Sequence, residues 1–512
     1  TLLYTHSLRV NINLLDIFSR KLTLNTIQIN GLTSQIYREF PDTTFNYSFI
    51  TRAFTSNPDS LVKTHKSSPD WNIILHKIQL NNCSLTYNDT ISGTSIALRS
   101  GELKTSFDVF NLPEKKLFLG DVQFYNAFIS FVKTQSLNEK QKQSKPFDYE
   151  IMADKLIINE MKAIFTDKTI KSSFQSDIEN LYVDVNKLDI KNETVELSSL
   201  FMTETEIVYT REKSAPVDSL TASIAAFTKK NVSNEKSNWQ LQLHKLELKG
   251  NSFTYNNTSF PPASNGIDFN HLLVKDLSLK SSDIYVNPYK INLQLHHMRL
   301  KEKSGFTLNE FSAHVNYDST HIELASLNIE TEKSHIREYL SMHFKSIQNI
   351  KSSINDIAFK VNLYNTTVDI EDVLLFVPGL RKNIIFENNA QTIIQLRTKI
   401  EGQMDNIQVE TFALELKQST KVEFKGNIKN ILSPQKMYAD ISEIKCSTSD
   451  KEFYSFVPQK AMSKNLLVPA AVNVTGNFKG YLKNFDSKIN INTSIGEIAA
   501  NIKMNPDAGN IE

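Results

Sequence analysis

The chain has 512 residues, with 57 lysines and arginines against 56 aspartates and glutamates, so its formal net charge is +1. This balance gives no general reason to expect a nucleic-acid partner, and a hydrophobic content of 40% excludes a disordered chain. The length exceeds that of one ordinary domain, so we expect several domains or an extended array of repeats.

From the first residues onward, most of the chain alternates apolar and polar side chains, which is the period of a half-buried strand. Lys21–Asn30 reads KLTLNTIQIN, and Glu193–Tyr209 reads ETVELSSLFMTETEIVY. The same pattern recurs along the whole chain, and no strand–helix–strand rhythm accompanies it. We therefore predict an all-β fold with a few short helices.

Four short segments are predicted to be helices. Two of them carry apolar residues on a single helical stripe, and the other two stop just before a proline, which cannot continue a helix. They are Phe45–Phe54, Val217–Phe227, Ile370–Val377 and Glu452–Val457. We expect these helices to be plugs packed over the end or edge of a sheet.

One segment occurs three times, which is the strongest sign of internal repetition. Each copy starts with an aromatic residue, carries a lysine, and places another aromatic residue ten positions after that lysine. The copies are Trp71–Thr90, Tyr149–Lys168 and Trp239–Thr258, with their lysines at Lys77, Lys155 and Lys245, and weaker copies begin near Thr26, Asp121, Ser199 and Ser326. Their unequal spacing argues against a closed propeller and favours an open array.

The apolar positions of each strong copy change parity near its lysine. The change falls between Leu75 and Ile78, between Ala153 and Leu156, and between Leu243 and Leu246. Because a strand has a period of two, one inserted residue is needed to keep all these side chains on one face. A β-bulge supplies such a residue and bends its strand, so matched bulges would fold the sheet lengthwise into a trough. The alternative is two strands joined by a tight turn near the lysine.

A second kind of repeat begins near Ile370. It contains a glycine followed four positions later by an asparagine, first as Gly402–Asn406 and again as Gly480–Asn484. The short helices before these motifs recur with nearly the same offset. We therefore predict two regions: residues 1–370, made of β-repeats with short helices near 45–54 and 217–227, and residues 371–512, made of helix-led groove repeats that continue beyond the chain end.

Catalytic signatures are missing from the sequence. It has no phosphate-binding glycine loop, no nucleophile elbow and no zinc-protease motif. Seven of the eleven histidines fall between His271 and His343 without metal-ligand spacing, and Cys83 and Cys446 are too far apart to frame a zinc site. We expect no enzyme activity, no catalytic residue, no metal and no cofactor. A pair of carboxylates of the glycosidase kind stays open, because such pairs form in space and not in sequence.

A sheet with one apolar face must cover that face. Alternation alone favours a β-sandwich, whereas the uninterrupted repeats and the parity changes favour an elongated, repetitive antiparallel sheet curled into an open groove. Each candidate for the floor of that groove is also explained by an ordinary core position. The candidates are Ile73, Leu75, Ile78, Leu80, Ile151, Leu156, Ile158, Leu241, Leu243, Leu246 and Leu248.

The segments KLTLNTIQINGLTSQIYRE, FNYSFITRAF and WNIILHKIQLNNCSLTYNDTISGTSIALRSGELK, in this order, resemble the amino-terminal part of long AsmA/TamB-like proteins. DVLLFVPGL, IEGQMDNIQVETFALEL and VTGNFKGYLKNFDSKININTSIGEIAANIKM resemble the TamB-type repeats that follow. The resemblance covers essentially the whole chain. It implies a periplasmic protein, anchored in the inner membrane by a segment missing from this chain, that carries phospholipid to the outer membrane. It also implies an outer-membrane barrel partner of the Omp85 type.

Four functions follow from these observations. The first is a lipid conduit, and the second is an outer-membrane assembly factor whose sheet edge pairs with client strands. The third is a surface adhesin made of β-sandwiches, and the fourth is a carbohydrate-active enzyme on a repetitive β scaffold.

Overall fold

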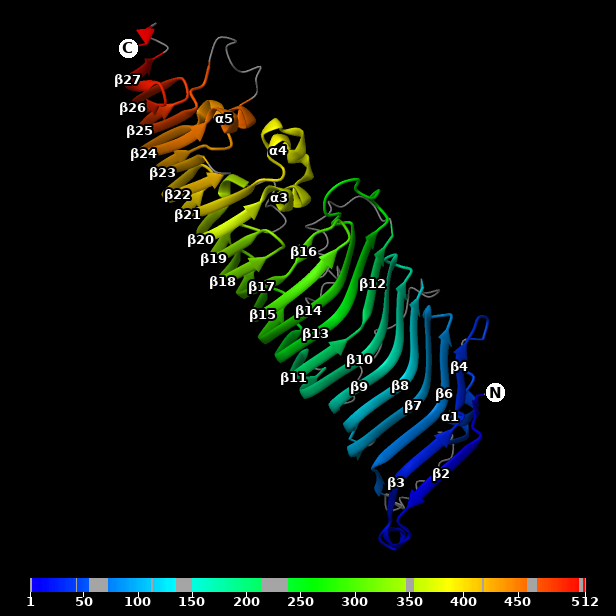
Figure 1. Ribbon diagram of the computed structural model, residues 1–512. Coiled ribbons are helices and arrows are strands. Elements are labelled where there is room, and N and C mark those ends of the chain that lie inside the picture. Colours follow the sequence, from blue (N-terminus) through cyan, green and yellow to red (C-terminus); the bar gives the residue numbers. More distant parts are fainter. Residues whose placement is uncertain are drawn as a thin grey trace. The chain divides into compact units, whose positions relative to one another are not determined.

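The computed structural model describes residues 2–42, 44–54, 72–111, 114–134, 150–190, 192–212, 238–346, 354–416, 419–457, 467–505 and 510–511. Its contacts divide the chain into two compact units. Unit 1 comprises Thr1–Asp218, Asn231–Pro261 and Asn270–Ser278, and unit 2 comprises Ser219–Lys230, Pro262–Phe269 and Leu279–Glu512. Both are built almost entirely of strands, which confirms the predicted all-β class (Figure 1).

Unit 1 contains thirteen described strands and the start of a fourteenth. They are β1 (Leu3–Tyr4), β2 (Ser7–Ile12), β3 (Lys21–Asn30), β4 (Thr33–Arg38), β5 (Asn72–Leu75), β6 (Lys77–Asp89), β7 (Thr94–Asn111), β8 (Lys116–Lys133), β9 (Glu150–Asp167), β10 (Ser172–Asp189), β11 (Thr194–Thr203), β12 (Glu206–Arg211), β13 (Gln240–Asn257) and β14 (His271–Asn287). A 3₁₀ turn, Leu14–Ser19, and helix α1, Ser48–Phe54, complete the unit.

Unit 1 repeats in groups of three strand positions. Within a group the neighbours are antiparallel, as in β6–β7–β8, and the first strand of the next group, β9, lies parallel to β8. The same parallel step joins β3 and β4 to β6, and β11 and β12 to β13. The sheet is therefore mixed and not purely antiparallel. The cause is the odd number of strands per repeat, since two repeats that start in the same direction place parallel strands side by side.

The three strong sequence copies are the strands that follow these parallel steps, namely β5–β6, β9 and β13. Three of the weaker copies are their parallel neighbours in matching register: Asp121 pairs with Lys155, and Ser199 pairs with Lys245. The copy near Thr26 is aligned with Lys77 in the same way, because Ile27 pairs with Ile78. The fourth weak copy differs, since Ser326 lies in an antiparallel strand of unit 2.

The predicted parity changes correspond to real interruptions of the strand pairing. His76 separates β5 from β6, and the pairing of β8 with β9 skips from Ala153 to Lys155. The pairing of β11 with β13 likewise skips from Leu243 to Lys245. No tight turn occurs there, because β9 and β13 each continue as one strand. The strand pairing is therefore interrupted at the predicted positions, where both parallel neighbours skip one residue.

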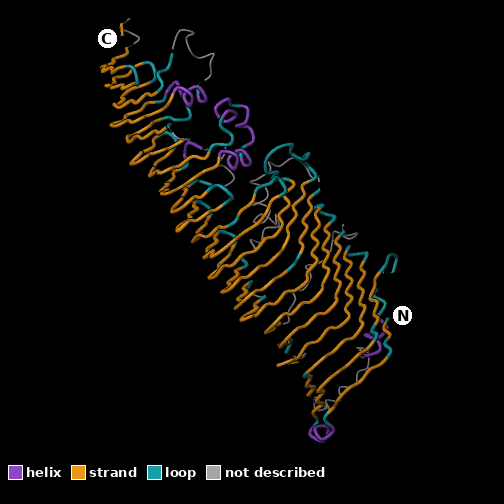
Figure 2. Tube along the Cα trace, in the orientation of Figure 1, coloured by secondary structure: helices purple, strands orange, loops and turns teal. Residues whose placement is uncertain are grey.

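A second line of interruptions, which the alternation pattern does not predict, lies five residues after each repeat lysine. Asn82, Glu160 and Gly250 all have positive φ there, and Asn126 has the same conformation on β8. Pairing resumes normally on both sides of this line, for example at Asn81–Glu102 and Cys83–Ser100. The left-handed residues turn each strand at the same level, so the strands of unit 1 are bent along their length (Figure 2).

Each repeat strand ends in an Asp or Asn that closes the following turn. Asp89 accepts hydrogen bonds from the backbone of Ile91 and Ser92 at 3.1 and 3.2 Å. Asp167 and Asn257, at the same repeat position, accept from the backbone amides two residues further on. Their carboxylate or amide oxygens replace the backbone partners that the turn lacks.

Unit 2 contains the rest of β14 and the strands from β15 onward. They are β15 (Lys290–Glu302), β16 (Thr307–Leu308), β17 (Glu310–Asp318), β18 (His321–Glu330), β19 (His335–His343), β20 (Ala358–Asp369), β21 (Ile393–Gln403), β22 (Asn406–Leu416), β23 (Thr420–Lys429), β24 (Tyr438–Ser449), β25 (Ala471–Tyr481), β26 (Asn484–Thr493), β27 (Gly496–Asn505) and β28 (Asn510–Ile511). Its helices are α3 (Ile370–Phe376), α4 (Ile384–Asn388) and α5 (Asp450–Phe456), with 3₁₀ turns at Ile354–Asp356, Pro378–Lys382 and Pro434–Lys436.

The pairings of unit 2 between β15 and β28 are antiparallel throughout. Four strands make one repeat: β20 and α3 are followed by three strands, and β24 and α5 then repeat the pattern. Asp369 and Ser449 cap the two helices by accepting backbone hydrogen bonds. The helix-led repeat expected from the sequence is confirmed here.

Three of the four predicted helices are present as α1, α3 and α5, while 217–227 lies outside the described residues. α3 directly follows the end of β20, and its Leu374 is fully buried. Asp372 of α3 accepts hydrogen bonds from Thr331 and Ser334 at 2.6 and 2.5 Å, which fixes the helix to the β18–β19 turn. This agrees with a plug at the end of a sheet.

The glycine–asparagine motifs of unit 2 are two hairpins with the same register. Gly402 pairs with Ile407, and Gly480 pairs with Phe485. Gly480 has φ +140°, and a Cβ there would lie 2.4 Å from the carbonyl oxygen of Asn484. Only glycine permits this approach of the two backbones.

Each unit has a single sheet layer. Among the described elements, strands contact mainly the strands to which they are hydrogen-bonded, and no second sheet is stacked on them. The β-sandwich that alternation alone would favour is therefore not formed. One face of each sheet must consequently carry its apolar side chains without a partner sheet.

Candidate functional site

Cross-strand pairs define the two faces of the unit 1 sheet, because residues paired directly across neighbouring strands point to the same side. Following the pairs from strand to strand gives rows that run across the sheet, perpendicular to the strands. Rows that hold the apolar residues of the repeats form one face, which we call the apolar face of unit 1.

Two aliphatic rows occupy the middle of this face. The first consists of Ile27, Ile78, Thr105, Val122, Leu156, Val183, Leu200 and Leu246. The second consists of Ile29, Leu80, Leu103, Phe124, Ile158, Leu181, Met202 and Leu248. Neither row contains a charged residue. With strands about 4.8 Å apart, each row is roughly 34 Å long.

The eleven residues predicted from the sequence all lie in such rows. Six are in the two aliphatic rows, and five precede the first interruption: Ile73, Leu75, Ile151, Leu241 and Leu243. His76 and Lys77 are both exposed, so the extra residue is accommodated on the exposed side and Leu75 stays on the side of Ile78. The structure thus brings the eleven together on one face; their contact with lipid stays a prediction.

Exposure along this face is uneven. Leu75 and Leu243 are 4% exposed, whereas Ile73, near the strand end, is 44% exposed. The remaining residues are buried or half-buried. Around the second interruption, side chains from both halves of a bent strand pack together: Leu80 lies in one cluster with Cys83, and Ile158 in another with Met161. The bend therefore keeps the face continuous.

An aromatic row follows beyond the bend. It consists of Ile36, Tyr87, Ile96, Phe131, Phe165, Phe174, Tyr209 and Tyr255. The rings of Phe131 and Phe165 stack with centroids 5.0 Å apart, and those of Tyr209 and Tyr255 stack at 5.9 Å. The sequence did carry a signal for this row, namely the aromatic residue ten positions after each repeat lysine. We had not assigned it to the site.

The last row on the same face is polar. It consists of Arg38, Asp89, Thr94, Lys133, Asp167, Ser172, Arg211 and Asn257. Each strand of unit 1 therefore passes from aliphatic to aromatic to polar side chains on one face. Nothing in the sequence pattern alone indicated this row, because its members come from strands far apart in the chain.

Asp89 is the most strongly perturbed acid of this row. Arg38 donates to it through Nε at 2.9 Å and forms an ion pair with it, while the Asp89 side chain is only 2% exposed. Burial by itself would raise the pKa of this carboxyl, but the hydrogen bonds from Arg38 and Ser92 outweigh it and hold the pKa well below its ordinary value. The guanidinium of Arg38 also lies 4.6 Å from the centre of the Phe45 ring.

The opposite face of unit 1 is mainly polar, with a few aromatic side chains such as Phe201. Asn159 donates to Asn180 at 2.8 Å, and Asn180 donates to Thr203 at 3.2 Å, along one row. Lys245 lies over the ring of Phe201 on the same face. The unit 1 sheet thus has an apolar side and a hydrogen-bonded, solvated side.

Unit 2 carries its own apolar rows. One consists of Leu293, Val315, Leu324, Leu340, Val361, Ile400, Val409, Gly426, Ile441 and Phe478. Another, in the helix-led repeats, consists of Leu396, Leu414, Val422, Cys446, Val474, Ile491 and Ile498. None of these residues had been singled out from the sequence.

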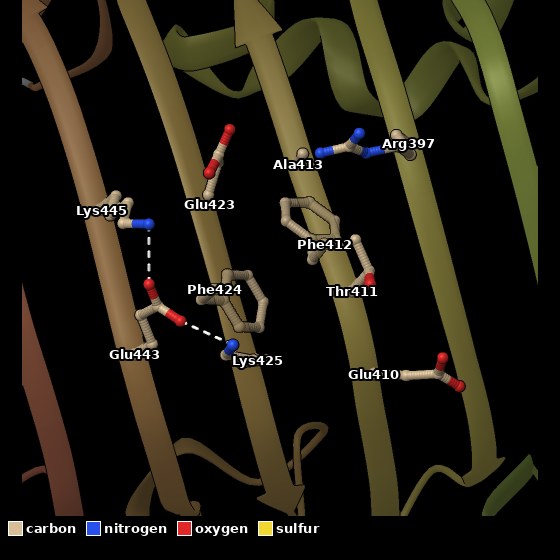
Figure 3. A pocket seen from close by; sticks show the side chains of 10 residues that line it. All are labelled: Arg397, Glu410, Thr411, Phe412, Ala413, Glu423, Phe424, Lys425, Glu443 and Lys445. Atoms are coloured by element: carbon tan, nitrogen blue, oxygen red, sulfur yellow. Dashed lines mark ion pairs between the residues drawn. The ribbon is translucent and has the colours of Figure 1, made fainter.

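The charged side of unit 2 contains a pocket across β21–β24 (Figure 3). Glu443 forms ion pairs with Lys425 and Lys445, both at 2.7 Å. These two lysines lower the pKa of Glu443 to about 2. Arg397, Glu410 and Glu423 complete its charged lining. The pocket is open and its charges neutralise one another, so it has the character of a solvated surface and not of a binding centre.

Metal-binding groups do not assemble in the part of the chain that the structure describes. No group of three or more His, Cys, Asp or Glu side chains could hold a metal ion among those residues. The adjacent His296 and His297 contact different partners, Ser282 and Glu310. His321 and His343 stack as a cross-strand pair, with ring centres 4.0 Å apart.

Comparisons with protein-family models, with curated proteins and with solved structures find no match to this chain. Of the helices that the structure describes, none has the length and apolar character needed to cross a bilayer.

Proposed function

We propose that this chain is a lipid carrier that holds acyl chains on the apolar faces of its sheets and guides them across the strands. The observation that carries the proposal is the pair of aliphatic rows in unit 1, which cross eight strand positions without a charged residue. No second sheet covers this face among the described strands.

Transfer free energy explains why such rows suit an acyl chain. Each methylene that leaves a bilayer and meets water costs about 0.8 kcal/mol. Aliphatic side chains at every strand remove that cost, and they present the same surface at each step. A guest moving along a row therefore meets no large barrier, and no step of this function requires catalysis.

The resemblance to AsmA/TamB-like proteins supplies the proposed setting. The carrier would lie in the periplasm, anchored in the inner membrane, and it would deliver phospholipid toward an outer-membrane barrel partner. These three points rest on the resemblance alone.

The test replaces Leu246 and Leu248 by aspartate, which places two charges in the aliphatic rows. Lipids that co-purify with the chain are then counted by mass spectrometry. We expect the double variant to lose most of its lipid, because buried carboxylates would face the acyl chains. Lipid retention at the wild-type level would refute the assignment of these rows.

The matched control is Lys245→Asp with Lys249→Asp, which places two carboxylates on the opposite, solvated face of the same strand. Lipid content should not change in this control. Far-ultraviolet circular dichroism and Trp239 fluorescence show whether each variant keeps its fold. Loss of lipid in both variants would point to misfolding and would count against the proposal.

Cys446 gives an independent measurement in unit 2, because it pairs with Val422 and Val474 in an apolar row. Its thiol is half-buried, and burial raises its pKa. Adding phosphatidylglycerol should slow the alkylation of Cys446 in the intact chain. The extent of alkylation is measured on the proteolytic peptide that contains Cys446. Equal rates with and without lipid would exclude unit 2 from the conduit.

A second candidate function is strand addition to clients. Edge strand β2 pairs only with β3 among the described strands, and its Leu8, Val10 and Ile12 are exposed. A proline at Val10 would block new backbone pairing at this edge. Loss of client crosslinking with unchanged lipid content would favour this function over the conduit.

A further inference from the structure

We propose that Arg211 binds the phosphate of a phospholipid whose acyl chains lie on the aliphatic rows of unit 1. This inference rests on the proposed lipid function and adds to it an orientation and a headgroup contact. The observation that carries it is a cation with no counter-ion among the described residues, at the polar end of a face that runs from aliphatic to aromatic to polar.

The order of side chains along each strand matches the layers of a membrane leaflet. Aromatic rings favour the boundary between hydrocarbon and headgroups, because they combine an apolar body with a polar edge or hydroxyl. The hydrocarbon half of a bilayer is about 15 Å thick, which equals roughly five residues of strand. Five residues back from Tyr87 is Asn82, at the bend, next to Leu80 and Cys83. A lipid with its carbonyls at the aromatic row would therefore place its chain ends at the bend, beside the second aliphatic row.

The polar row repeats one arrangement three times, and the third copy differs. A cation at the end of one strand faces the turn-closing residue of its parallel neighbour, as Arg38–Asp89, Lys133–Asp167 and Arg211–Asn257. Arg38 is neutralised by an ion pair with Asp89. Lys133 is close enough to Asp167 to help lower the pKa of that carboxyl. In the third copy an asparagine replaces the acid.

Arg211 therefore has no carboxylate partner among the described residues. Its cross-strand neighbours are Ser172 and Asn257, both neutral. The nearest acid of the row, Asp167, lies two strands away, roughly 10 Å. Asp167 is also occupied by the backbone amides of Thr169 and Ile170. A half-exposed guanidinium beside the stacked Tyr209 and Tyr255 is free to make paired hydrogen bonds to a phosphate.

Two photoreactive phosphatidylglycerol probes test this inference on the full chain. One carries a diazirine next to the headgroup, and the other carries it at the end of an acyl chain. We expect the headgroup probe to label the ends of β12 and β13, near residues 209–211 and 255–258. The acyl probe should label β13 near Leu246 and Leu248.

Asn257→Asp is the decisive variant, because it rebuilds the ion pair present in the other two copies. Asp also keeps the oxygen that accepts from the backbone of Ser259, so the turn is retained. We expect about tenfold less headgroup labelling at β12 and β13 in this variant and in Arg211→Gln. Acyl labelling near Leu246 should be unchanged. Lys133→Gln is the matched control, and it should leave headgroup labelling at β12 and β13 as in the wild type.

Different results of these experiments would contradict different parts of the proposal. Headgroup labelling that is unaffected by Asn257→Asp, or that falls at the other end of β13 near residues 240–243, would overturn the role of Arg211 while leaving the lipid function intact. Absence of acyl labelling in the wild-type chain would refute both the lipid function and this inference.

Discussion

Unit 1 and unit 2 present similar apolar rows but connect their strands in different ways. Unit 1 uses three strand positions per repeat and therefore includes parallel pairs, such as β8–β9. Unit 2 uses four strands per repeat, and its pairings from β15 onward are antiparallel, with a short helix at each repeat junction. The number of strands per repeat, odd or even, decides whether neighbouring repeats meet in parallel.

The two units also differ in the backbone geometry of their strands. Unit 1 places left-handed residues at one level of its long strands, including Asn82 and Glu160. Unit 2 has left-handed residues too, such as Ser326, and it adds Gly402 and Gly480, where the next backbone lies too close for a side chain. The comparison teaches that the apolar face is the common feature, whereas topology and local backbone geometry differ. Three predictions probe this difference.

The largest effect is expected for Gly480→Ala in unit 2. A Cβ at this position would meet the backbone of Asn484 at 2.4 Å and that of Phe485 at 2.6 Å, at a φ of +140°. The neighbouring strand must shift, so we expect a loss of roughly 2–4 kcal/mol in the unfolding free energy of unit 2. Chemical denaturation followed by circular dichroism measures this loss.

Gly379→Ala is the matched control, because a Cβ there meets nothing within 4 Å. The two tryptophans, Trp71 and Trp239, fall in the sequence ranges of unit 1 and report on that unit. Their fluorescence transition should not move in Gly480→Ala. Equal stability of the two alanine variants would show that the close approach is not needed.

An intermediate effect is expected for Asp89→Ala in unit 1. The change removes a buried carboxylate that is paired with Arg38 and closes a turn, so we expect a loss of about 3 kcal/mol. Tryptophan fluorescence during denaturation measures it. A loss in the unit 2 transition and none in unit 1 would contradict this assignment.

The same pair predicts a pH dependence. The pKa of Asp89 is lower in the folded chain than in the unfolded chain, so its stabilisation is fully present above the unfolded value of about 4. It is lost progressively as the pH falls below that value toward the folded pKa. Unit 1 of the wild type should therefore weaken below about pH 4, and this part of the acid sensitivity should be absent in Asp89→Asn.

The smallest effect is expected for Glu160→Gly at the bend of unit 1. Glu160 has φ +57°, a conformation that costs a residue with a Cβ about 1 kcal/mol, and the equivalent position in the third copy is already Gly250. The variant should be as stable as the wild type or more stable by up to about 1 kcal/mol. Glu160→Val should instead destabilise unit 1, and the reverse order in thermal denaturation would show that the bend does not depend on this conformation.

The local pattern was sufficient for the elements and for part of the site. Period-two alternation predicted strands, prolines and apolar stripes predicted α3 and α5, and the parity changes predicted the interruptions at His76 and His244. The eleven predicted residues fall on one face because alternation directly encodes which side of a strand each residue takes. The sequence repeats even contain the register of the parallel strands, because the copies that start at Asp121 and Lys155 pair at those two residues. We interpreted these copies only as repeats.

The sequence by itself determined that the chain is all-β, that it repeats, and which side of each strand is apolar, because these properties depend on residues close together in the chain. Only the tertiary structure decided which strands are neighbours, where the left-handed bend falls, and which side chains stand in one row. Those features depend on pairing between residues tens of positions apart. Arg211 shows the consequence: its cross-strand neighbours Ser172 and Asn257 come from two other strands, so the fact that both are neutral is visible only once the strands are paired.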